Sequence, residues 1–199
     1  MNLRVSSGFL RGRFIKVPET NLRPTEEKVR SAFFNTLFSM IEFEERIFLD
    51  IFSGSGIFAF EAVSRGFSKS FSIESNPKAV SDIKKSAAEL DITNQVNVVN
   101  ADAFSLNFSS LNEKFNTIFL DPPYILGDRM PDLLDKIVDS GIVGEVCVIV
   151  VEGNSETPWQ KTGWSTKTKK FGGTYLSFFY NWSVQKGVSA DEEIGECAI

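Results

Sequence analysis

The chain has 199 residues, of which 42% are hydrophobic and 24% are charged, and its formal net charge is −5. This length suits a single domain, and these proportions are those of an ordinary globular protein. The chain has no histidine and only two cysteines, which excludes a Ser-His or Cys-His nucleophile and a histidine-bearing metal site.

We expect a cytoplasmic protein with no membrane partner. No apolar stretch approaches the roughly 20 residues that a membrane span needs, and the first residues lack the layout of a signal peptide. Only two cysteines occur, Cys147 in an apolar run and Cys197 in an acidic segment, so we expect no disulfide framework and a reducing compartment.

The beginning of the chain predicts a basic extension. Residues 2–17 alternate around two glycines like a β-hairpin, so we expect a hairpin extension over residues 1–22. Residues 1–30 hold seven basic side chains against three acidic ones, which leaves −9 on the remainder. A basic segment on an acidic body predicts a surface that contacts RNA phosphates. Its candidate residues are Arg4, Arg11, Arg13, Lys16 and Arg23.

Strand and helix patterns then alternate. Thr25 is a good N-cap, and apolar residues recur at helical spacing over 29–40. Further helices are expected at 57–64, from 77 to about 90, and at 131–138. Strands are expected at 46–52, 70–73, 96–99, 115–120, 146–151, 165–171 and 174–182, the last two joined by Gly172-Gly173 as a hairpin.

This alternation predicts an α/β fold. We expect a Rossmann-like, doubly wound, mostly parallel seven-stranded sheet with an antiparallel edge hairpin over residues 23–183. Residues 184–199 are polar and acidic, and are expected to be a disordered tail.

Four successive predicted strands each carry an acid at or just after their carboxyl end. These acids are Asp50, Glu74, Asp102 and Asp121. The carboxyl ends of parallel strands meet at one edge of a sheet, where ligands of doubly wound folds bind. Four acids at that edge predict a site for a polar ligand.

The segment after the first of these strands predicts a cofactor site. Gly54-x-Gly56-x-x-Ala59 fits the dinucleotide pattern G-x-G-x-x-A, but Asp50 just before it would repel a pyrophosphate. The same acid suits the ammonium and sulfonium of S-adenosylmethionine, with Glu74 on the ribose hydroxyls. The candidate cofactor-binding residues are Asp50, Ser53, Gly54, Ser55, Gly56, Glu74, Asp102 and the backbone of Ala103.

Asp121-Pro122-Pro123-Tyr124 follows the apolar run 115–120 and predicts the catalytic site. The Asp121 carboxylate and the Pro122 carbonyl can both accept hydrogen bonds from one planar amine, drawing its lone pair out of conjugation. The Pro122-Pro123 pair is stiff and offers no N–H donor. Tyr124 can stack on the ring that bears the amine.

Taken together, these motifs resemble the RsmD-type 16S ribosomal RNA guanine-N2 methyltransferases, a family of class I S-adenosylmethionine-dependent enzymes. The resemblance covers about residues 3–182. It is carried by Arg4-Val5, Ser7-Gly8, Arg11-Gly12-Arg13, Leu22-Arg23-Pro24-Thr25, Val29-Arg30, Phe34-Asn35, Asp50-x-Phe52-x-Gly54-Ser55-Gly56, Glu61-Ala62-x-Ser64-Arg65-Gly66, Glu74 and Asp121-Pro122-Pro123-Tyr124.

The resemblance implies transfer of a methyl group from S-adenosylmethionine to the exocyclic N2 amine of one guanine in 16S rRNA, within an assembled or assembling small ribosomal subunit. We expect the enzyme to act as a monomer and without a metal. The residues themselves support transfer to an aromatic amine, but they do not choose guanine over adenine.

Alternatives remain open. An adenine-N6 methyltransferase acting on DNA or RNA would use the same motif. A protein-glutamine methyltransferase usually carries Asn where Asp121 stands. A nicotinamide-dependent oxidoreductase would share the glycine pattern. A non-enzymatic RNA-binding assembly factor would not need an intact Asp121-Pro122-Pro123-Tyr124.

Overall fold

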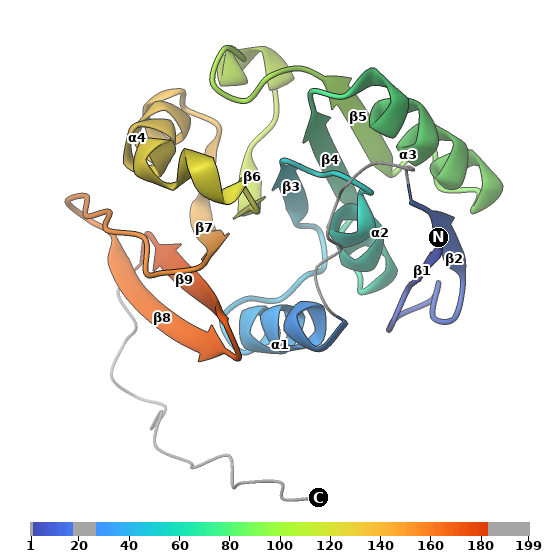
Figure 1. The fold of residues 1–199 in the computed structure, drawn as a ribbon, viewed down its shortest axis with the longest axis horizontal. Helices are drawn as coiled ribbons and strands as arrows, with labels where there is room; N and C mark the ends of the chain where they lie inside the picture. The colour runs from blue at the N-terminus through green and yellow to red at the C-terminus, as the bar shows by residue number, and fades with distance from the viewer. Residues whose placement is uncertain (1, 18–26, 183–199) are drawn as a thin grey trace, which may run out of the picture.

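The computed structural model describes residues 2–17 and 27–182. Its centre is a seven-stranded sheet with helices on both faces (Figure 1). The predicted contact residue Arg23, the predicted cap Thr25 and the predicted tail 184–199 lie outside the described residues. Among the described helices, none is both long enough and apolar enough to cross a membrane.

The sheet has the order β5-β4-β3-β6-β7-β9-β8. Neighbouring strands from β5 to β7 pair in parallel, and β9 runs antiparallel to both β7 and β8. The strands are β3 (Ile47–Ile51), β4 (Lys69–Glu74), β5 (Val96–Asn100), β6 (Phe115–Leu120), β7 (Val143–Gly153), β8 (Ser165–Phe171) and β9 (Thr174–Tyr180). The expected fold, including its antiparallel edge hairpin, is therefore confirmed. The chain reverses direction across the sheet between β3 and β6, which makes their carboxyl ends the switch point.

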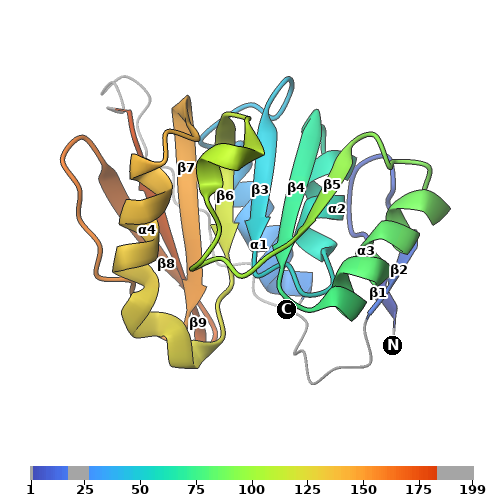
Figure 2. The same ribbon diagram turned by 90° about the horizontal axis from the view of Figure 1, so that it is seen from above.

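Two apolar clusters cover the two faces of the sheet. One holds residues of α1 (Glu27–Phe38), α2 (Ile57–Ser64) and α3 (Pro77–Glu89), and the other holds residues of η1 (Phe108–Leu111) and α4 (Met130–Asp139). Figure 2 shows α4 in front of the sheet and α1 and α2 behind it. The two 3₁₀ helices, η1 and η2 (Tyr124–Arg129), have no counterpart among the predicted elements.

Helix α2 is enclosed on every side, since all eight of its residues are buried. The ring of Phe58 stacks on that of Phe119 from β6, with centroids 4.0 Å apart. Gly56 precedes the helix with φ of 75°, and a Cβ there would come within 3.0 Å of Ile83 on α3. Glycine is thus needed where the loop after β3 turns into the helix.

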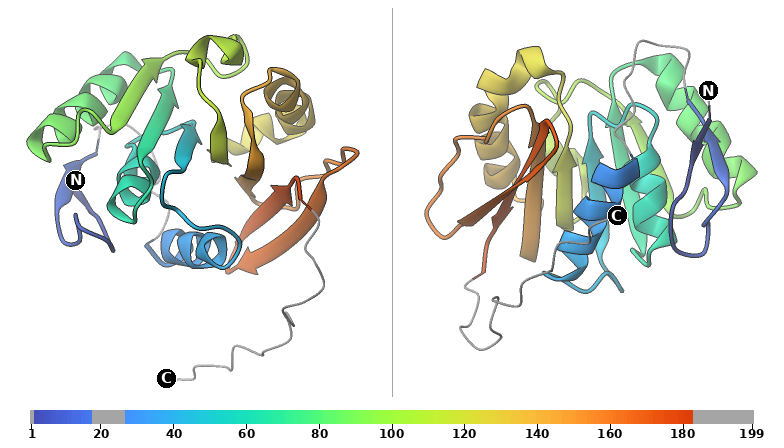
Figure 3. Two further views of the ribbon diagram at one scale, coloured as in Figure 1. Left: turned by 180° about the vertical axis from the view of Figure 1, so that it is seen from behind. Right: turned by 60° about the horizontal axis from the view of Figure 1, so that its bottom comes forward.

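The predicted N-terminal hairpin is present and is fastened to the end of α2. Strands β1 (Asn2–Arg4) and β2 (Phe14–Lys16) pair antiparallel, beside α3 in the rear view of Figure 3. The Phe9 amide donates to the Ser64 carbonyl oxygen at 2.9 Å. A Cβ on Gly8 would lie only 1.7 Å from that oxygen, so the hairpin can dock this closely only with glycine there.

Candidate active site at the carboxyl edge of the sheet

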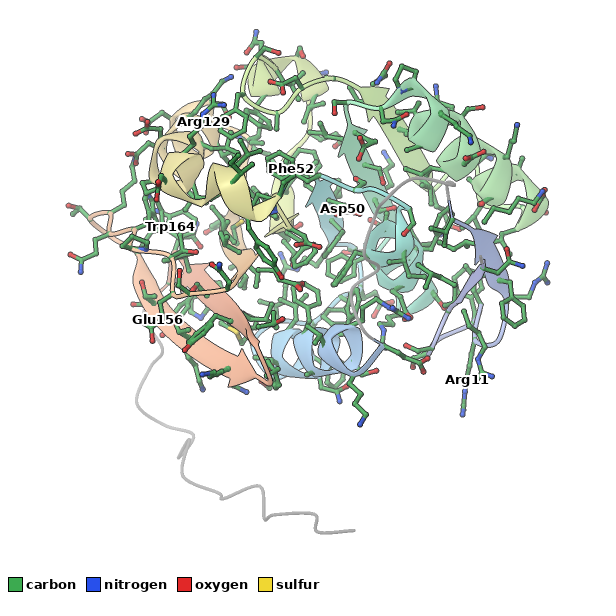
Figure 4. All side chains as sticks on the ribbon, in the orientation of Figure 1. Arg11, Asp50, Phe52, Arg129, Glu156 and Trp164 are labelled. Carbon is green, nitrogen blue, oxygen red and sulfur yellow. The ribbon has the colours of Figure 1, made fainter. Side chains whose placement is uncertain are left out.

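A cavity of about 670 Å³ opens at the carboxyl ends of the parallel strands. Figure 4 shows Asp50 and Phe52 near the middle of the molecule, where this cavity lies. No described residue that lines it carries a positive charge. Its lining includes Val17, Val29, Asp50, Phe52, Ser53, Gly54, Ser55, Ile57, Phe58, Glu74, Ser75, Phe119, Asp121, Pro122, Pro123, Tyr124, Glu152, Phe171, Gly172, Gly173 and Thr174.

The loop after β3 is held in a tight turn. The Ser53 hydroxyl donates to the Asp50 carbonyl oxygen at 2.7 Å, and the Gly56 amide donates to the Ser53 carbonyl oxygen at 2.7 Å. Phe52 has φ of 66°, a left-handed conformation that is costly for a bulky residue. Backbone strain of this kind persists at ligand-binding turns because the surroundings enforce it.

Glu74, at the end of β4, ties this loop to the start of α3. One carboxylate oxygen accepts from the Gly54 amide at 2.8 Å, and the other accepts from the Asn76 amide at 2.8 Å. The Ser75 hydroxyl also donates to the oxygen that faces Asn76, at 3.4 Å, whereas the oxygen that faces Gly54 can accept a further hydrogen bond. Glu74 therefore shapes the loop and keeps some capacity to bind a ligand, and this support of the loop was not indicated by the sequence.

Asp50 is a buried carboxylate that the described residues leave partly unsatisfied. The side chain is 2% exposed, and its Oδ2 atom has no hydrogen-bond partner among them. Burial, followed by the neighbouring charge of Asp121, raises the pKa of Asp50 well above its ordinary value, and Glu74 adds to the effect. A cationic ligand placed here would offset all of these costs.

The predicted catalytic segment borders the same cavity. The Asp121 amide donates to the Ile51 carbonyl oxygen at 3.4 Å, which fixes the end of β6 beside that of β3. Pro122 is buried, whereas Tyr124 is 62% exposed and begins η2. The backbone at Asp121 is thus fixed beside β3, while the exposed ring of Tyr124 stands at the mouth of the cavity.

Two predicted cofactor contacts do not reach this cavity. Asp102 accepts the Ser105 amide at 3.0 Å in a turn after β5, and Ala103 is buried behind it. Neither residue lines the cavity. Their predicted contact with adenine stays a prediction.

The predicted RNA-contacting residues that the structure describes lie on the hairpin, and all are exposed. Lys16 already forms an ion pair with Glu89 of α3 at 2.9 Å. Arg11 projects from the hairpin's outer end in Figure 4, close to the turn that docks on Ser64. Eight helical residues span about 12 Å, so Arg11 and Arg13 would contact phosphates well away from the pocket.

Glu152 is a site residue that the sequence interpretation missed. It follows Val151 near the end of β7, lines the cavity and is 7% exposed. Burial, and then the charge of Asp121, raises the pKa of Glu152 to about 8. No alternation marked it, because residues 146–151 are apolar at every position, as is usual in a strand buried on both faces. The Phe171–Thr174 turn between β8 and β9 was likewise not expected at the site.

This fold and this carboxylate-lined switch point define the chain as a Rossmann-like protein of the methyltransferase class. A family model described as "Conserved hypothetical protein 95" matches residues 3–180. The chain belongs to that family, which is the RsmD family that its motifs indicated.

Named relatives agree with this assignment. The chain is 31% identical over 192 residues to "Ribosomal RNA small subunit methyltransferase D" of Escherichia coli (strain K12), covering 95% of this chain and 94% of that protein. It is 34% identical over 163 residues to YlbH of Bacillus subtilis (strain 168), covering 80% of this chain and 87% of that one. The solved structure of yhhF from Escherichia coli superposes with a TM-score of 0.76 at 30% identity, covering 91% of this chain and 98% of that one.

Proposed function

We propose that this protein transfers a methyl group from S-adenosylmethionine to the exocyclic N2 amine of a guanine in small-subunit ribosomal RNA. The observation that carries the proposal is Asp121-Pro122-Pro123-Tyr124 at the switch point, beside the buried, partly unsatisfied Asp50. The named relative from Escherichia coli, a small-subunit rRNA methyltransferase, supports the substrate class.

The charges of the cavity support S-adenosylmethionine over a dinucleotide. Asp50, Glu74, Asp121 and Glu152 all line it, and no described lining residue is basic. A pyrophosphate would be repelled by this field, whereas a sulfonium and an ammonium would be attracted. In this proposal Asp50 faces the cationic end, Glu74 takes the ribose, and the Ser53–Gly56 loop packs on the ligand.

The chemistry then follows from position. When bound, S-adenosylmethionine supplies a sulfonium methyl group, which the amine lone pair attacks as the carbon–sulfur bond breaks with its electrons going to sulfur. The Asp121 carboxylate and the Pro122 carbonyl accept hydrogen bonds from the amine and so direct its lone pair. Tyr124 holds the base by stacking. The amine proton becomes acidic only once the new bond forms and is then lost to water, so no strong base is needed before attack. Positioning therefore supplies most of the rate enhancement.

Base mapping in cells tests the proposal. Ribosomal RNA from cells with and without the protein should differ at one N2-methylguanine in the small-subunit RNA, as measured by mass spectrometry of nuclease fragments. Loss of an N6-methyladenine instead would establish the adenine alternative. Identical maps would refute a ribosomal RNA substrate.

Asp121 gives the sharpest test of the chemistry. Asp121→Ala should lower kcat by on the order of 10²–10³-fold, the effect expected for losing one group that stabilises a transition state. Affinity for S-adenosylhomocysteine, measured by calorimetry, should stay within a few-fold. Tyr124→Phe should be mild and Tyr124→Ala severe, because stacking on the base is worth about 1–3 kcal/mol. Near-normal turnover by Asp121→Ala would contradict this mechanism.

A further inference from the structure

Glu152 is a buried acid for which the chemistry above has no role. Its Oε2 atom has no hydrogen-bond partner among the described residues. Burying an acceptor without a partner costs about 1–3 kcal/mol, so such a group inside a cavity calls for a ligand that donates to it.

The strand registers place Glu152 beside Asp121 and on the same face of the sheet. Leu120 of β6 pairs with Val151 of β7, so the next residue of each strand, Asp121 and Glu152, is also a neighbouring pair. Alternation along each strand turns both side chains toward the face where Phe119 and Val150 pack, which is the face covered by α1 and α2.

The order of strands places Glu152 on the side of Asp121 away from the proposed cofactor residues. Along the sheet edge the acids run Glu74 on β4, Asp50 on β3, Asp121 after β6 and Glu152 on β7. If Asp121 holds the amine toward the cofactor side, the ring that bears the amine extends toward β7. Glu152 therefore faces the atoms of the ring next to the amine.

Those neighbouring ring atoms differ among the bases. In guanine, the carbon that bears the amine lies between N3, which only accepts, and N1, which carries a hydrogen. In adenine and cytosine, the one ring nitrogen beside the amine-bearing carbon carries no hydrogen and only accepts. A carboxylate on the N1 side of the amine therefore gains a hydrogen bond with guanine, and has no ring N–H to accept from in the other two bases.

We propose that Glu152 is the residue that selects guanine, by accepting a hydrogen bond from N1–H while Asp121 holds the N2 amine. This inference rests on the proposed function and deepens it, since Asp121-Pro122-Pro123-Tyr124 alone serves any aromatic amine. Burial raises the pKa of Glu152 to about 8, so the acid is mostly protonated near neutral pH in the empty cavity, and the form that accepts from N1–H is the ionised one, which prevails above pH 8. Enzymes that modify a base commonly read its Watson–Crick edge inside such a pocket.

The test replaces the target guanine by 2-aminopurine, which keeps the amine but has an unprotonated N1. Small-subunit particles are assembled on RNA carrying either base, and kcat/KM is measured for both with the full-length protein at a pH slightly above 8, where Glu152 is mostly ionised. Wild type should prefer guanine by on the order of ten- to a hundred-fold, the usual worth of a specific base contact. Glu152→Gln should reduce that ratio at least several-fold, because its amide can donate to the unprotonated N1.

Controls separate base selection from damage to the protein. Glu156→Gln makes the same change at an exposed acid four residues on, outside the cavity lining, and should leave the ratio unchanged (Figure 4). Glu152→Ala should lose activity on guanine without gaining any on 2-aminopurine. The missing O6 of 2-aminopurine affects every variant alike and cancels when the ratios are compared.

The outcomes distinguish this inference from the proposed function. Guanine methylation by wild type, with an unchanged base ratio in Glu152→Gln, would overturn only the role of Glu152. A wild-type enzyme that methylates adenine and not guanine would overturn both. A reduced ratio in Glu152→Gln, with normal affinity for S-adenosylhomocysteine, would establish Glu152 as the residue that selects the base.

Discussion

Buried carboxylates have different hydrogen-bond and ion-pair partners at the two ends of α2. At the end where the hairpin docks, Glu61 is fully buried but surrounded by donors. It forms ion pairs with Arg65 at 3.1 Å and Arg30 at 3.8 Å, and both the amide and the hydroxyl of Ser6 donate to it at 2.7 Å. At the end where the cavity opens, Asp50 and Glu152 each keep a buried oxygen with no partner among the described residues.

The difference separates charges that hold the fold together from charges that await a ligand. A buried acid stabilises a protein only when its partners are built in, as they are around Glu61. An acid left unsatisfied weakens the fold and persists where a ligand offsets the cost, which is why perturbed pKa values gather at functional sites. Removing an acid from each region should therefore have opposite consequences.

Glu61 should give the largest effect on stability. Glu61→Ala would leave two arginines near the hairpin contact without their buried partner, and should lower the free energy of unfolding by about 3–5 kcal/mol. Urea denaturation measures this. Glu61→Gln, which keeps an oxygen acceptor for Ser6, should lower the free energy of unfolding by a smaller amount. A loss below about 1 kcal/mol would mean that the cluster is not a structural ion pair.

Replacing Glu152 should raise the free energy of unfolding rather than lower it, and the size of this effect should depend on pH. Its pKa rises from 4.5 to about 8 in the folded protein, so the folded state binds the proton more tightly than the unfolded chain does. Stability from this group is complete below pH 4.5 and is lost as the pH rises to about 8.

Glu152→Gln removes this dependence. It should therefore raise the free energy of unfolding by up to a few kcal/mol at pH 9 and change it little near pH 4.5. Thermal melts at both pH values, with Glu156→Gln as the control, test it. If Glu152→Gln destabilised the protein equally at both pH values, Glu152 would be a structural residue like Glu61.

Glu74 tests the proposed cofactor half of the cavity. Glu74→Ala should cost about 1.5–3 kcal/mol of binding, as for hydrogen bonds to a charged group. This cost corresponds to an affinity for S-adenosylmethionine that is lower by on the order of ten- to a hundred-fold, as measured by calorimetric titration. Glu113→Ala removes an acid that pairs with Lys69 at the opposite end of β4, and should leave affinity unchanged. Equal affinity in both variants would reduce Glu74 to a support for the loop.

The hairpin arginines should have the smallest effect. If Arg11 and Arg13 contact phosphates, each alanine substitution should lower the slope of log affinity for small-subunit particles against log salt by a bit under one unit. Lys114→Ala, the same charge change just before the first residue of the central strand β6, should not. Cofactor affinity should stay the same throughout. An unchanged slope would mean that the arginines are exposed to solvent and do not contact phosphates.

The sequence predicted most of the elements because their signals are local. Ile57–Ser64 matches the expected helix residue for residue, and Phe115–Leu120 matches the expected strand. Strand β7 extends beyond the predicted 146–151 at both ends, because pairing with neighbours can recruit residues of low strand propensity such as Gly144. The short η1 and η2 carry too few residues to show a period.

What the sequence determined by itself was the fold class, the family and the presence of acids at the ends of β3, β4 and β6, because these depend on short motifs and on the order of strand and helix patterns. Which strands become neighbours depends on the whole chain, and only the tertiary structure decided it. By placing β7 next to β6 it set Glu152 beside Asp121, and by docking the hairpin on α2 it surrounded Glu61 with donors. The sequence shows that each of these acids is present. Whether an acid is satisfied or left waiting for a ligand depends on groups distant in sequence, because charge and hydrogen bonding act through space.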